Sequence, residues 1–267
     1  MEPKKAPLKQ NRNTFDKVFD ALIDWVEARN VQFSEVGNPP IYESSVFPWA
    51  KEIEKDWENI REELEDVLKD REQLPSFHEI TKEVETITTD NNWKTFFLAG
   101  YGIECEENRR RCPNTVMALE KIPGMKTAMF SILSPGKHIP AHRGPYNGVL
   151  RYHLGLVIPE PREQCKIRVH DQYYSWAEGE GVIFDDSFDH EVWNDTDGVR
   201  VVLFVDFERP LKNPGKMINS LVINLAKHTP YLKEANDNQK KWEEKFYAEK
   251  KKKAAEEKER ETVGADK

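Results

Sequence analysis

Hydrophobic residues follow a helical period in two stretches near the beginning of the chain. The first runs from Phe15 to Val26, where the spacing predicts a helix with one packed face. Asn38-Pro39-Pro40 then breaks the chain. From about Phe47 to Lys69 a second stripe predicts a longer helix that packs against a sheet. The two stripes comprise Phe15, Val18, Phe19, Leu22, Trp25 and Val26, and Trp49, Ile53, Trp57, Ile60, Leu64 and Val67.

After Pro75 the pattern changes to short runs rich in β-branched and aromatic residues. Turn signals such as Ser134-Pro135-Gly136 separate these runs. Many short strands with such punctuation indicate a sandwich or barrel, and the double-sheet jelly roll is one solution. The predicted strands are Lys94–Tyr101, Thr127–Leu133, Gly148–Ile158, Cys165–Val169, Gln172–Trp176, Gly181–Phe184 and Val199–Phe207.

These patterns predict four parts of the chain. Residues 1–12 are expected to be a disordered N-terminus, and residues 13–74 a helical region packed on the core. Residues 75–232 form the β-rich domain, in which Met217–Ala226 can add a helix. Residues 233–267 are rich in Lys and Glu, which indicates a solvated helix or a disordered tail.

Composition narrows the class of protein. Among 267 residues, 38% are hydrophobic and 33% charged, and the net charge is −8. This balance argues against a nucleic-acid partner but leaves room for an anionic substrate in a small basic pocket. Because no run approaches the roughly eighteen apolar residues of a membrane helix, and the start resembles no secretory signal, we expect a soluble, cytoplasmic protein with no transmembrane segment.

Two segments of the β-rich part carry more polar groups than a structural strand needs. The first surrounds His142 and the second surrounds His190. Imidazole suits iron, copper and zinc, and non-haem iron oxygenases use two histidines with open positions for other ligands. A carboxylate normally joins them two residues after the first histidine, but this sequence has Gly144 there. The spacing alone leaves open whether these histidines are ligands or structural groups.

Five motifs between about Phe47 and Pro210 resemble the catalytic domain of the aspartyl/asparaginyl β-hydroxylase family: FPWAKEIEKDW, HRGPYN, LRYHLGLVIP, CKIRV and the highly specific IFDDSFDHEVWND. The resemblance implies a mainly β fold, a double-stranded β-helix (a cupin-like jelly roll) with N-terminal helices packed on it. It also implies a dioxygenase that uses Fe(II), O2 and the cosubstrate 2-oxoglutarate to hydroxylate an unactivated carbon.

The resemblance also assigns residues. It makes His142 and His190 the iron ligands, with no further catalytic residue beyond the metal site. Gly144 matches a glycine that animal members of the family carry, so it marks a vacant carboxylate-ligand position.

Four further residues match cosubstrate-binding positions of the family. Arg200 and Ser131 correspond to the residues that hold the distal carboxylate of 2-oxoglutarate, a task suited to the planar fork of a guanidinium. Arg151 and His153 match a pair that faces the metal-proximal carboxylate and the substrate. As alternate residues of one strand they are expected to point to the same face.

The substrate is open between two classes. IFDDSFDHEVW, Gly144 and the Cys105–Cys112 frame favour an aspartyl/asparaginyl-type reaction on a peptide or amino acid. GVLRYHLGL and VVLFVDFERPL resemble bacterial relatives that 2-hydroxylate acyl chains of lipid A or ornithine lipids, which is the alternative. A non-catalytic cupin-like binding module is the second alternative, but it has no need of two carboxylate-binding sets.

Cys105 and Cys112 match a cysteine pair of the animal enzyme that can form a disulfide. We expect free thiols here, because disulfides are rare in a reducing cytosol. The charged segment between them, ECEENRRRC, is expected to be an exposed loop.

Overall fold

The computed structural model describes residues 14–101 and 103–265, so the expectation of a disordered segment at residues 1–12 lies outside the described residues. Two antiparallel sheets form its centre, one in the order β1-β9-β6-β11-β4-β2-β3 and the other in the order β5-β10-β7-β8. The strands are β1 (Ile41–Tyr42), β2 (Trp93–Gly100), β3 (Ile103–Glu104), β4 (Met125–Leu133), β5 (Lys137–His142), β6 (Val149–Val157), β7 (Cys165–Val169), β8 (Gln172–Ser175), β9 (Gly181–Phe184), β10 (His190–Asn194) and β11 (Arg200–Glu208).

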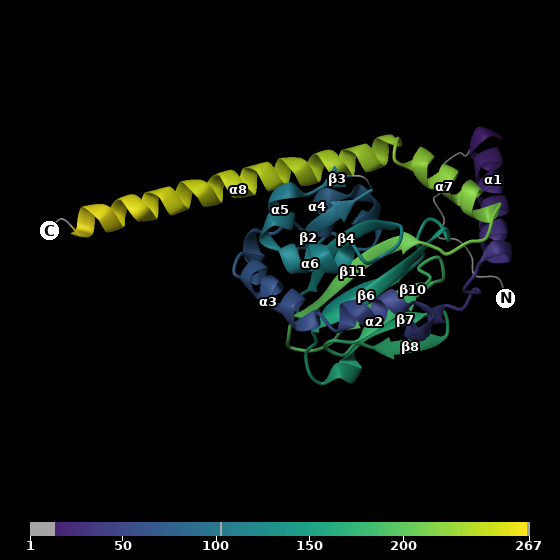
Figure 1. The fold of residues 1–267 in the computed structure, drawn as a ribbon, viewed down its shortest axis with the longest axis horizontal. Helices are drawn as coiled ribbons and strands as arrows, with labels where there is room; N and C mark the ends of the chain where they lie inside the picture. The colour runs from purple at the N-terminus through teal and green to yellow at the C-terminus, as the bar shows by residue number, and fades with distance from the viewer. Residues whose placement is uncertain (1–13, 102, 266–267) are drawn as a thin grey trace.

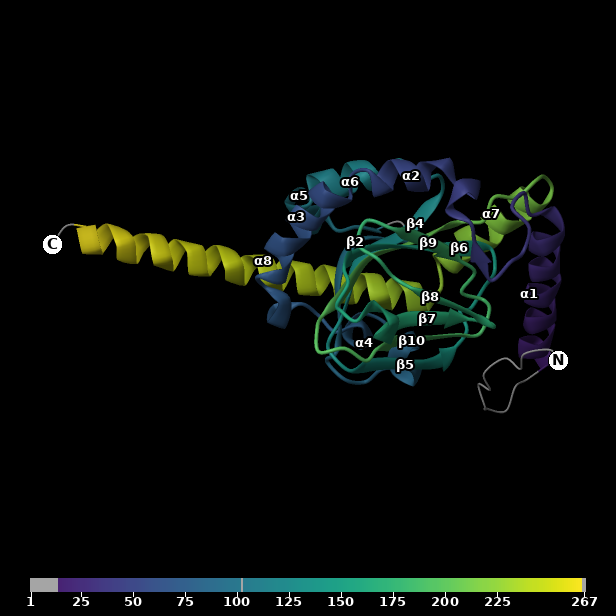
Figure 2. The same ribbon diagram turned by 90° about the horizontal axis from the view of Figure 1, so that it is seen from below.

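The molecule is layered, as Figure 2 shows. Helices α2 (Pro48–Glu54), α3 (Trp57–Leu68) and α6 (Pro113–Leu119) cover the outer face of the larger sheet with an apolar core. A second apolar core fills the space between the two sheets. Two facing antiparallel sheets with helices on the outside confirm the predicted mainly β jelly roll, the double-stranded β-helix.

The seven predicted strands are confirmed, with bounds that agree to within two residues. Two strands of the smaller sheet, β5 and β10, were not among the predictions. Both are rich in polar residues, so they lack the apolar runs by which a strand is recognised. They are also the two strands that carry His142 and His190.

The single helix predicted from about Phe47 to Lys69 is wrong, because α2 and α3 are separate helices. The chain turns at Asp56, whose N–H donates to the carbonyl of Ile53 at 3.0 Å. Asp is a poor residue for a helix interior, since its short side chain competes for backbone hydrogen bonds. The apolar stripe still packs on the sheet on both sides of this turn, where Ile53 and Ile60 are buried.

Helices α1 (Thr14–Phe33) and α7 (Gly215–Ala226) lie against each other at one end of the molecule (Figure 1). Both helices were predicted, but the packed face of α1 was not. Among its described side chains, α1 buries Val26 and Asn30, whereas Leu22 and Trp25 are exposed. The inner face is set by its polar contacts, because Asn30 donates hydrogen bonds to a neighbouring loop. The side chains of Phe15, Val18 and Phe19 lie outside the described part.

The charged C-terminal segment forms one long helix, α8 (Pro230–Ala265), which runs past α4 (Phe77–Ile80) and α5 (Glu106–Arg111) and then away from the sheets (Figure 1). Its first half packs, since Phe246 is buried and Glu243 accepts a hydrogen bond from the Asn108 N–H at 2.8 Å. The Lys/Glu pattern gives no sign of these contacts, because only a few residues make them. Along the described chain, no helix has both the length and the apolar character needed to cross a bilayer.

Candidate active site

His142 and His190 meet where the smaller sheet ends. His142 is the last residue of β5 and His190 the first of β10, and the two are register partners. Their ring centroids are 4.1 Å apart with the planes inclined by 51°. The register of two neighbouring antiparallel strands therefore brings together the two histidines that the sequence singles out.

The hydrogen bonds of the two rings leave the same nitrogen, Nε2, of each free to bind a ligand. Nδ1 of His142 lies 2.8 Å from the carbonyl of Pro140, and Nδ1 of His190 lies 3.0 Å from that of Phe188. A ring whose Nδ1–H donates to a carbonyl keeps the lone pair on Nε2 for a metal. Burial lowers the pKa of both histidines, that of His190 strongly. Both rings are thus kept neutral, the form that binds metals.

The space beside Gly144 is filled by another residue. A Cβ at Gly144 would lie 2.3 Å from Oδ2 of Asp186, and the Gly144 N–H donates to the Asp186 carbonyl at 2.7 Å. The vacant carboxylate position of the sequence is therefore adjacent to a carboxylate that comes from a different segment. Within the described residues, no group of three His, Cys, Asp or Glu side chains is arranged as a metal site.

Arg151 is paired with two carboxylates. Its Nε donates to Asp206 Oδ1 at 2.8 Å, its Nη2 lies 3.2 Å from Oδ2 of the same residue, and Nη2 also lies 2.9 Å from Asp186 Oδ2. Burial would lower the pKa of Arg151, but Asp186 and Asp206 outweigh it and raise the pKa above its ordinary value. Arg151 therefore links β6 to the segment that precedes His190.

Arg200 is buried with no carboxylate in contact. It begins β11, is 1% exposed, and makes long hydrogen bonds, each 3.4 Å, to the carbonyl and Oγ of Ser131. Its side chain is also hydrogen-bonded to the Cys165 thiol. Its guanidinium lies over the ring of Trp176, 4.4 Å from the centroid, and its Nε has no partner. Burial lowers the pKa of Arg200 to about 10. A buried guanidinium that contacts no carboxylate is well suited to bind an anion, because the anion would compensate its charge.

His153 lies between these groups. It is 5% exposed, packs against the rings of Phe184 and Phe204, and neither of its ring nitrogens has a hydrogen-bond partner. Burial lowers its pKa well below the ordinary value, and Arg200 and Arg151 lower it further. An unpaired buried imidazole is costly, so this ring also has unused capacity to bind a polar ligand.

The expected alternation on β6 is observed. Arg151 and His153 face the space between the sheets, whereas Tyr152 and Leu154 belong to the outer core under the helices. Sequence reasoning missed two carboxylates, Asp186 and Asp206. Asp206 had a recognisable signal, because it is a charge within the otherwise apolar run VVLFVDF. Asp186 lies inside the histidine motif, but nothing in its spacing indicates that it fills the space beside Gly144.

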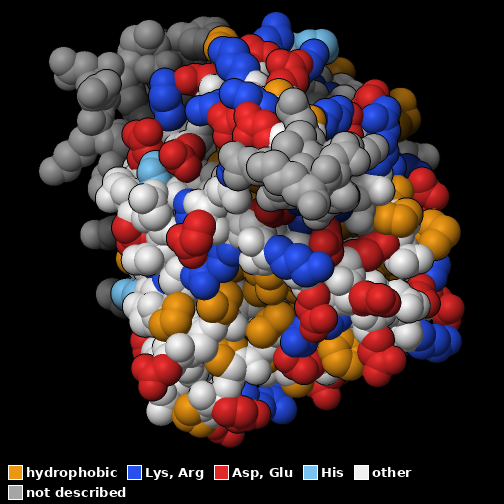
Figure 3. All heavy atoms as spheres, turned by 90° about the vertical axis from the view of Figure 1, so that its left-hand side faces the viewer, with side chains coloured by type: hydrophobic (Ala, Val, Ile, Leu, Met, Phe, Trp, Pro, Cys, Tyr) orange, Lys and Arg blue, Asp and Glu red, His pale blue; other side chains and the backbone are white. Residues whose placement is uncertain are grey.

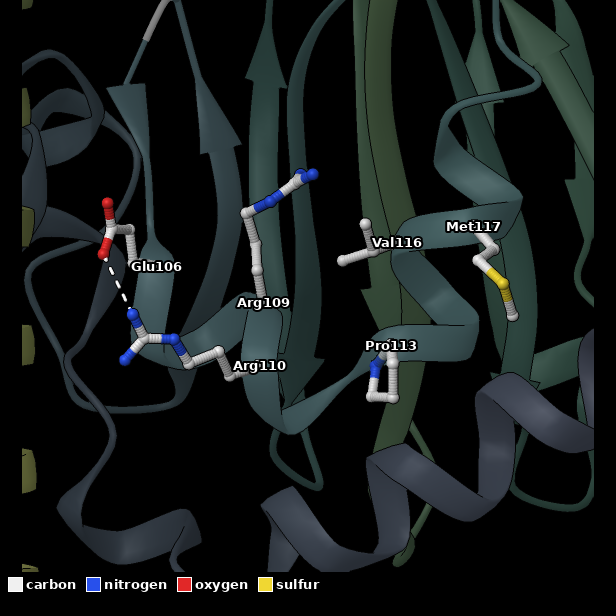
Figure 4. Close-up of a pocket in the computed structure, with 6 residues that line it drawn as sticks. All are labelled: Glu106, Arg109, Arg110, Pro113, Val116 and Met117. Atoms are coloured by element: carbon white, nitrogen blue, oxygen red, sulfur yellow. Dashed lines mark hydrogen bonds and ion pairs between the residues drawn. The ribbon is translucent and has the colours of Figure 1, made fainter.

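The segment between Cys105 and Cys112 is not an exposed loop, because it forms α5 and both thiols are buried and free. Figure 4 shows the open hollow that α5 and α6 line, remote in sequence from the histidine pair. Its Arg110 is paired with Glu106 and Glu107, so its charge is already compensated. The lining residues are Glu106, Arg109, Arg110, Pro113, Val116 and Met117.

Comparison with known proteins identifies relatives over most of this chain. Residues 54–210 match the family described as aspartyl/asparaginyl beta-hydroxylase. An ornithine lipid ester-linked acyl 2-hydroxylase of Rhizobium tropici is 55% identical over 233 residues, which cover 87% of this chain and 83% of the relative. The human aspartyl/asparaginyl beta-hydroxylase is 38% identical over 62% of this chain, which spans only 22% of that enzyme's length. A Pseudomonas putida prolyl-4-hydroxylase structure is similar with a TM-score of 0.38 and 17% identity over 57% of this chain and 87% of its own.

Proposed function

This chain belongs to the aspartyl/asparaginyl β-hydroxylase family of hydroxylases, and we propose that it is an Fe(II)- and 2-oxoglutarate-dependent hydroxylase of lipid acyl chains. Its iron ligands are His142 and His190. Its cosubstrate is held by Arg200 and Ser131, with His153 beside it.

The observation that carries the cosubstrate assignment is the buried guanidinium of Arg200, which contacts no carboxylate among the described residues. An isolated buried charge costs several kcal/mol, so a site that keeps one must regain that energy from a ligand. A carboxylate can meet the guanidinium fork in two parallel hydrogen bonds. Arg200 and His190 both lower the pKa of His153, so both lie within electrostatic range of its ring. One dicarboxylate reaching from the histidines to Arg200 accounts for both the buried charge and the unpaired imidazole.

In this proposal the side chains of the protein bind the iron and the cosubstrate and hold them in position. Iron with 2-oxoglutarate and O2 supplies the oxidising chemistry that converts a C–H bond to a C–OH bond. The carbonyls of Pro140 and Phe188 hold the two histidine rings in the orientation that directs Nε2 into the site. Trp176 and Phe204 keep water from the space between the sheets, which strengthens the charge interaction of Arg200 with its ligand.

The substrate assignment follows the extent of similarity. The ornithine lipid enzyme matches 87% of this chain at 55% identity, whereas the human enzyme matches 62% at 38%. The longer match reaches beyond the residues that the family domain covers, 54–210. This balance favours the lipid alternative over the peptide substrate that the motifs favoured.

An aspartyl/asparaginyl-type substrate is the second candidate. The specific observation in its favour is Gly144, which matches a glycine of the animal members and here leaves the space that Asp186 fills. The two candidates share the iron and cosubstrate sites and differ only in what is hydroxylated.

The test uses the purified protein with Fe(II), 2-oxoglutarate and O2. One sample receives ornithine lipid in detergent, and a second receives a peptide containing Asp and Asn residues. Mass spectrometry then follows the gain of one oxygen atom, and succinate is measured in parallel. Oxygen on the acyl chain with matching succinate supports the proposal, whereas oxygen on the peptide alone supports the second candidate. If neither substrate gains oxygen and no succinate forms, the chain is a binding module.

A further inference from the structure

Helix α7 presents an apolar stripe to the outside. Met217, Leu221 and Leu225 are spaced four residues apart and are 69%, 60% and 61% exposed. The opposite face of the helix buries Gly215, Asn219 and Ile223. A helix on the surface of a water-soluble domain ordinarily buries its apolar stripe. α7 instead buries an asparagine and exposes a methionine and two leucines.

Helix α1, which packs beside α7, also has exposed apolar side chains. Figures 1 and 2 both place α1 beside α7, and the two helices touch closely. A Cβ at Gly215 would lie 2.6 Å from Cβ of Phe33, so the helices could not approach this closely with a larger residue there. On α1, Leu22 and Trp25 are 53% and 47% exposed. We call Leu22, Trp25, Met217, Leu221 and Leu225 together the α1/α7 face.

The charges of the segment that carries α7 are of one sign, although α1 beside it carries Asp24 and Glu27. Residues 210–233 contain four lysines and no aspartate or glutamate, in a chain whose net charge is −8. At about 100° per residue, Lys216 and Lys227 fall on one side of α7 and flank the apolar stripe. The opposite end of the molecule, seen in Figure 3, carries Lys, Arg, Asp and Glu interspersed. Apolar residues flanked by lysines are the pattern of helices that lie in the surface of an anionic bilayer.

The buried face of α7 is bonded to the segment that leaves the metal site. Asn219 donates to the carbonyl of Gly148 at 2.8 Å and accepts from the hydroxyl of Tyr146 at 2.7 Å. Asn30 of α1 donates to the same hydroxyl at 3.0 Å. Tyr146 comes four residues after His142, so this segment joins the candidate active site to both helices.

We propose that the α1/α7 face docks on an anionic lipid bilayer, with Met217, Leu221 and Leu225 inserted at the level of the headgroups. The choice of a bilayer as the occupant rests on the proposed lipid substrate as well as on the lysines. A lipid substrate with long acyl chains resides in the membrane, so an enzyme that hydroxylates it has to meet the bilayer, and an apolar helix face flanked by lysines can bind at its surface.

The test measures binding separately from activity. The protein is sedimented with vesicles of phosphatidylcholine alone, or of phosphatidylcholine with phosphatidylglycerol. The triple variant M217Q/L221Q/L225Q is compared with the wild type and with M117Q, which alters an exposed methionine on α6. Binding to the anionic vesicles should fall about tenfold or more in the triple variant, because three insertable apolar side chains are lost. It should be unchanged in M117Q. Added salt should weaken wild-type binding.

Activity on ornithine lipid in detergent separates this proposal from the proposed function. The triple variant should keep that activity, since it retains every residue assigned to the site. If the wild type does not bind anionic vesicles but hydroxylates the lipid in detergent, the docking proposal fails and the proposed function stands. If it binds vesicles and hydroxylates no lipid, the docking surface stands and the function fails.

A second copy of the chain is the rival occupant. Sedimentation velocity of the wild type and the triple variant decides this point. A wild-type dimer that becomes a monomer in the triple variant, without vesicle binding by the wild type, would assign the α1/α7 face to an interface between copies and overturn the bilayer proposal.

Discussion

The carboxylate of Asp186 lies where a side chain at Gly144 would have to be. A Cβ built on Gly144 comes within 2.3 Å of Oδ2 and 2.6 Å of Oδ1 of Asp186, closer than real side chains approach. The same carboxylate is paired with Arg151 at 2.9 Å. Glycine at this position therefore makes room for an ion pair next to His142. A carboxylate added at this position has no free space to enter.

This relationship predicts that Gly144→Ala destabilises the protein although it adds a single methyl group. Overpacking against a fixed ion pair should lower the free energy of unfolding by about 1–3 kcal/mol. Gly100→Ala is the matched control, because a Cβ there meets its nearest neighbour at an ordinary 3.8 Å. Denaturant unfolding of both variants and of Gly144→Ala/Asp186→Ala makes the comparison. Because Asp186→Ala also breaks the pair with Arg151, the double variant is compared with Asp186→Ala alone, and Gly144→Ala should cost less stability in that background than in the wild type. An equal cost in both backgrounds would mean that Gly144 serves the backbone rather than Asp186.

Alternation and turn signals were enough to predict the seven strands and a sandwich or barrel, because buried strands are recognised by apolar runs. The family resemblance then selected the jelly roll. The local patterns could not predict that Asp56 divides the Phe47–Lys69 helix, since one residue of low propensity is often tolerated within a helix. Nor could they predict the exposure of Leu22 and Trp25. A periodic stripe indicates an apolar face, but only the surrounding fold decides whether anything covers it.

The site was predictable only in part, because several of its contacts join residues that are far apart in the sequence. His142 and His190 stood out as polar residues in a β-rich region, and their roles came from the family resemblance. That Arg200 has no carboxylate in contact, while Arg151 has two, depends on which strands become neighbours. Asp206 pairs with Arg151 because β11 and β6 are adjacent and the two residues are register partners. No local pattern in the sequence contains that information.

His142→Ala or His190→Ala should abolish hydroxylation and reduce Fe(II) binding while the protein stays folded. Each variant leaves one imidazole, and a single neutral ligand holds a divalent metal weakly. His138→Ala is the control, because His138 lies on the same strand as His142 but stacks on Trp193 and pairs with Glu191. Metal content, turnover and circular dichroism are measured for all three. Full activity in both ligand variants would refute the metal assignment.

Cys105 and Cys112 should resist alkylation in the folded protein at neutral pH. Burial raises the pKa of each thiol to about 12, so the reactive thiolate is scarce. Mass spectrometry after iodoacetamide treatment, with and without denaturant, tests this expectation. Rapid labelling of the folded protein, or a disulfide between the two, would contradict it.

The same raised pKa values predict how stability depends on pH. An unfolded cysteine has a pKa of about 8.5, so its ionisation favours the unfolded chain once the pH exceeds that value. The contribution of the neutral buried thiols is complete below that value and is lost as the pH rises toward the folded value of about 12. Thermal unfolding measured through this range should show a smaller alkaline decline for Cys105→Ala/Cys112→Ala than for the wild type.

Arg200→Ala should raise the 2-oxoglutarate requirement far more than the requirement for the hydroxylated substrate. The loss of a buried, charge-assisted pair costs about 2–5 kcal/mol, which is about 30-fold to several thousand-fold in affinity. Arg200→Lys should recover only part of it, since an ammonium cannot form the two parallel hydrogen bonds of a guanidinium. Arg110→Ala, which alters an exposed arginine paired with Glu106, serves as the control. Initial rates are measured against each substrate in turn. Circular dichroism and denaturant unfolding check that Arg200→Ala is folded, because the change also removes the contact of the guanidinium with Trp176 and leaves a cavity. If the folded variant has an unchanged 2-oxoglutarate requirement, Arg200 does not bind the cosubstrate.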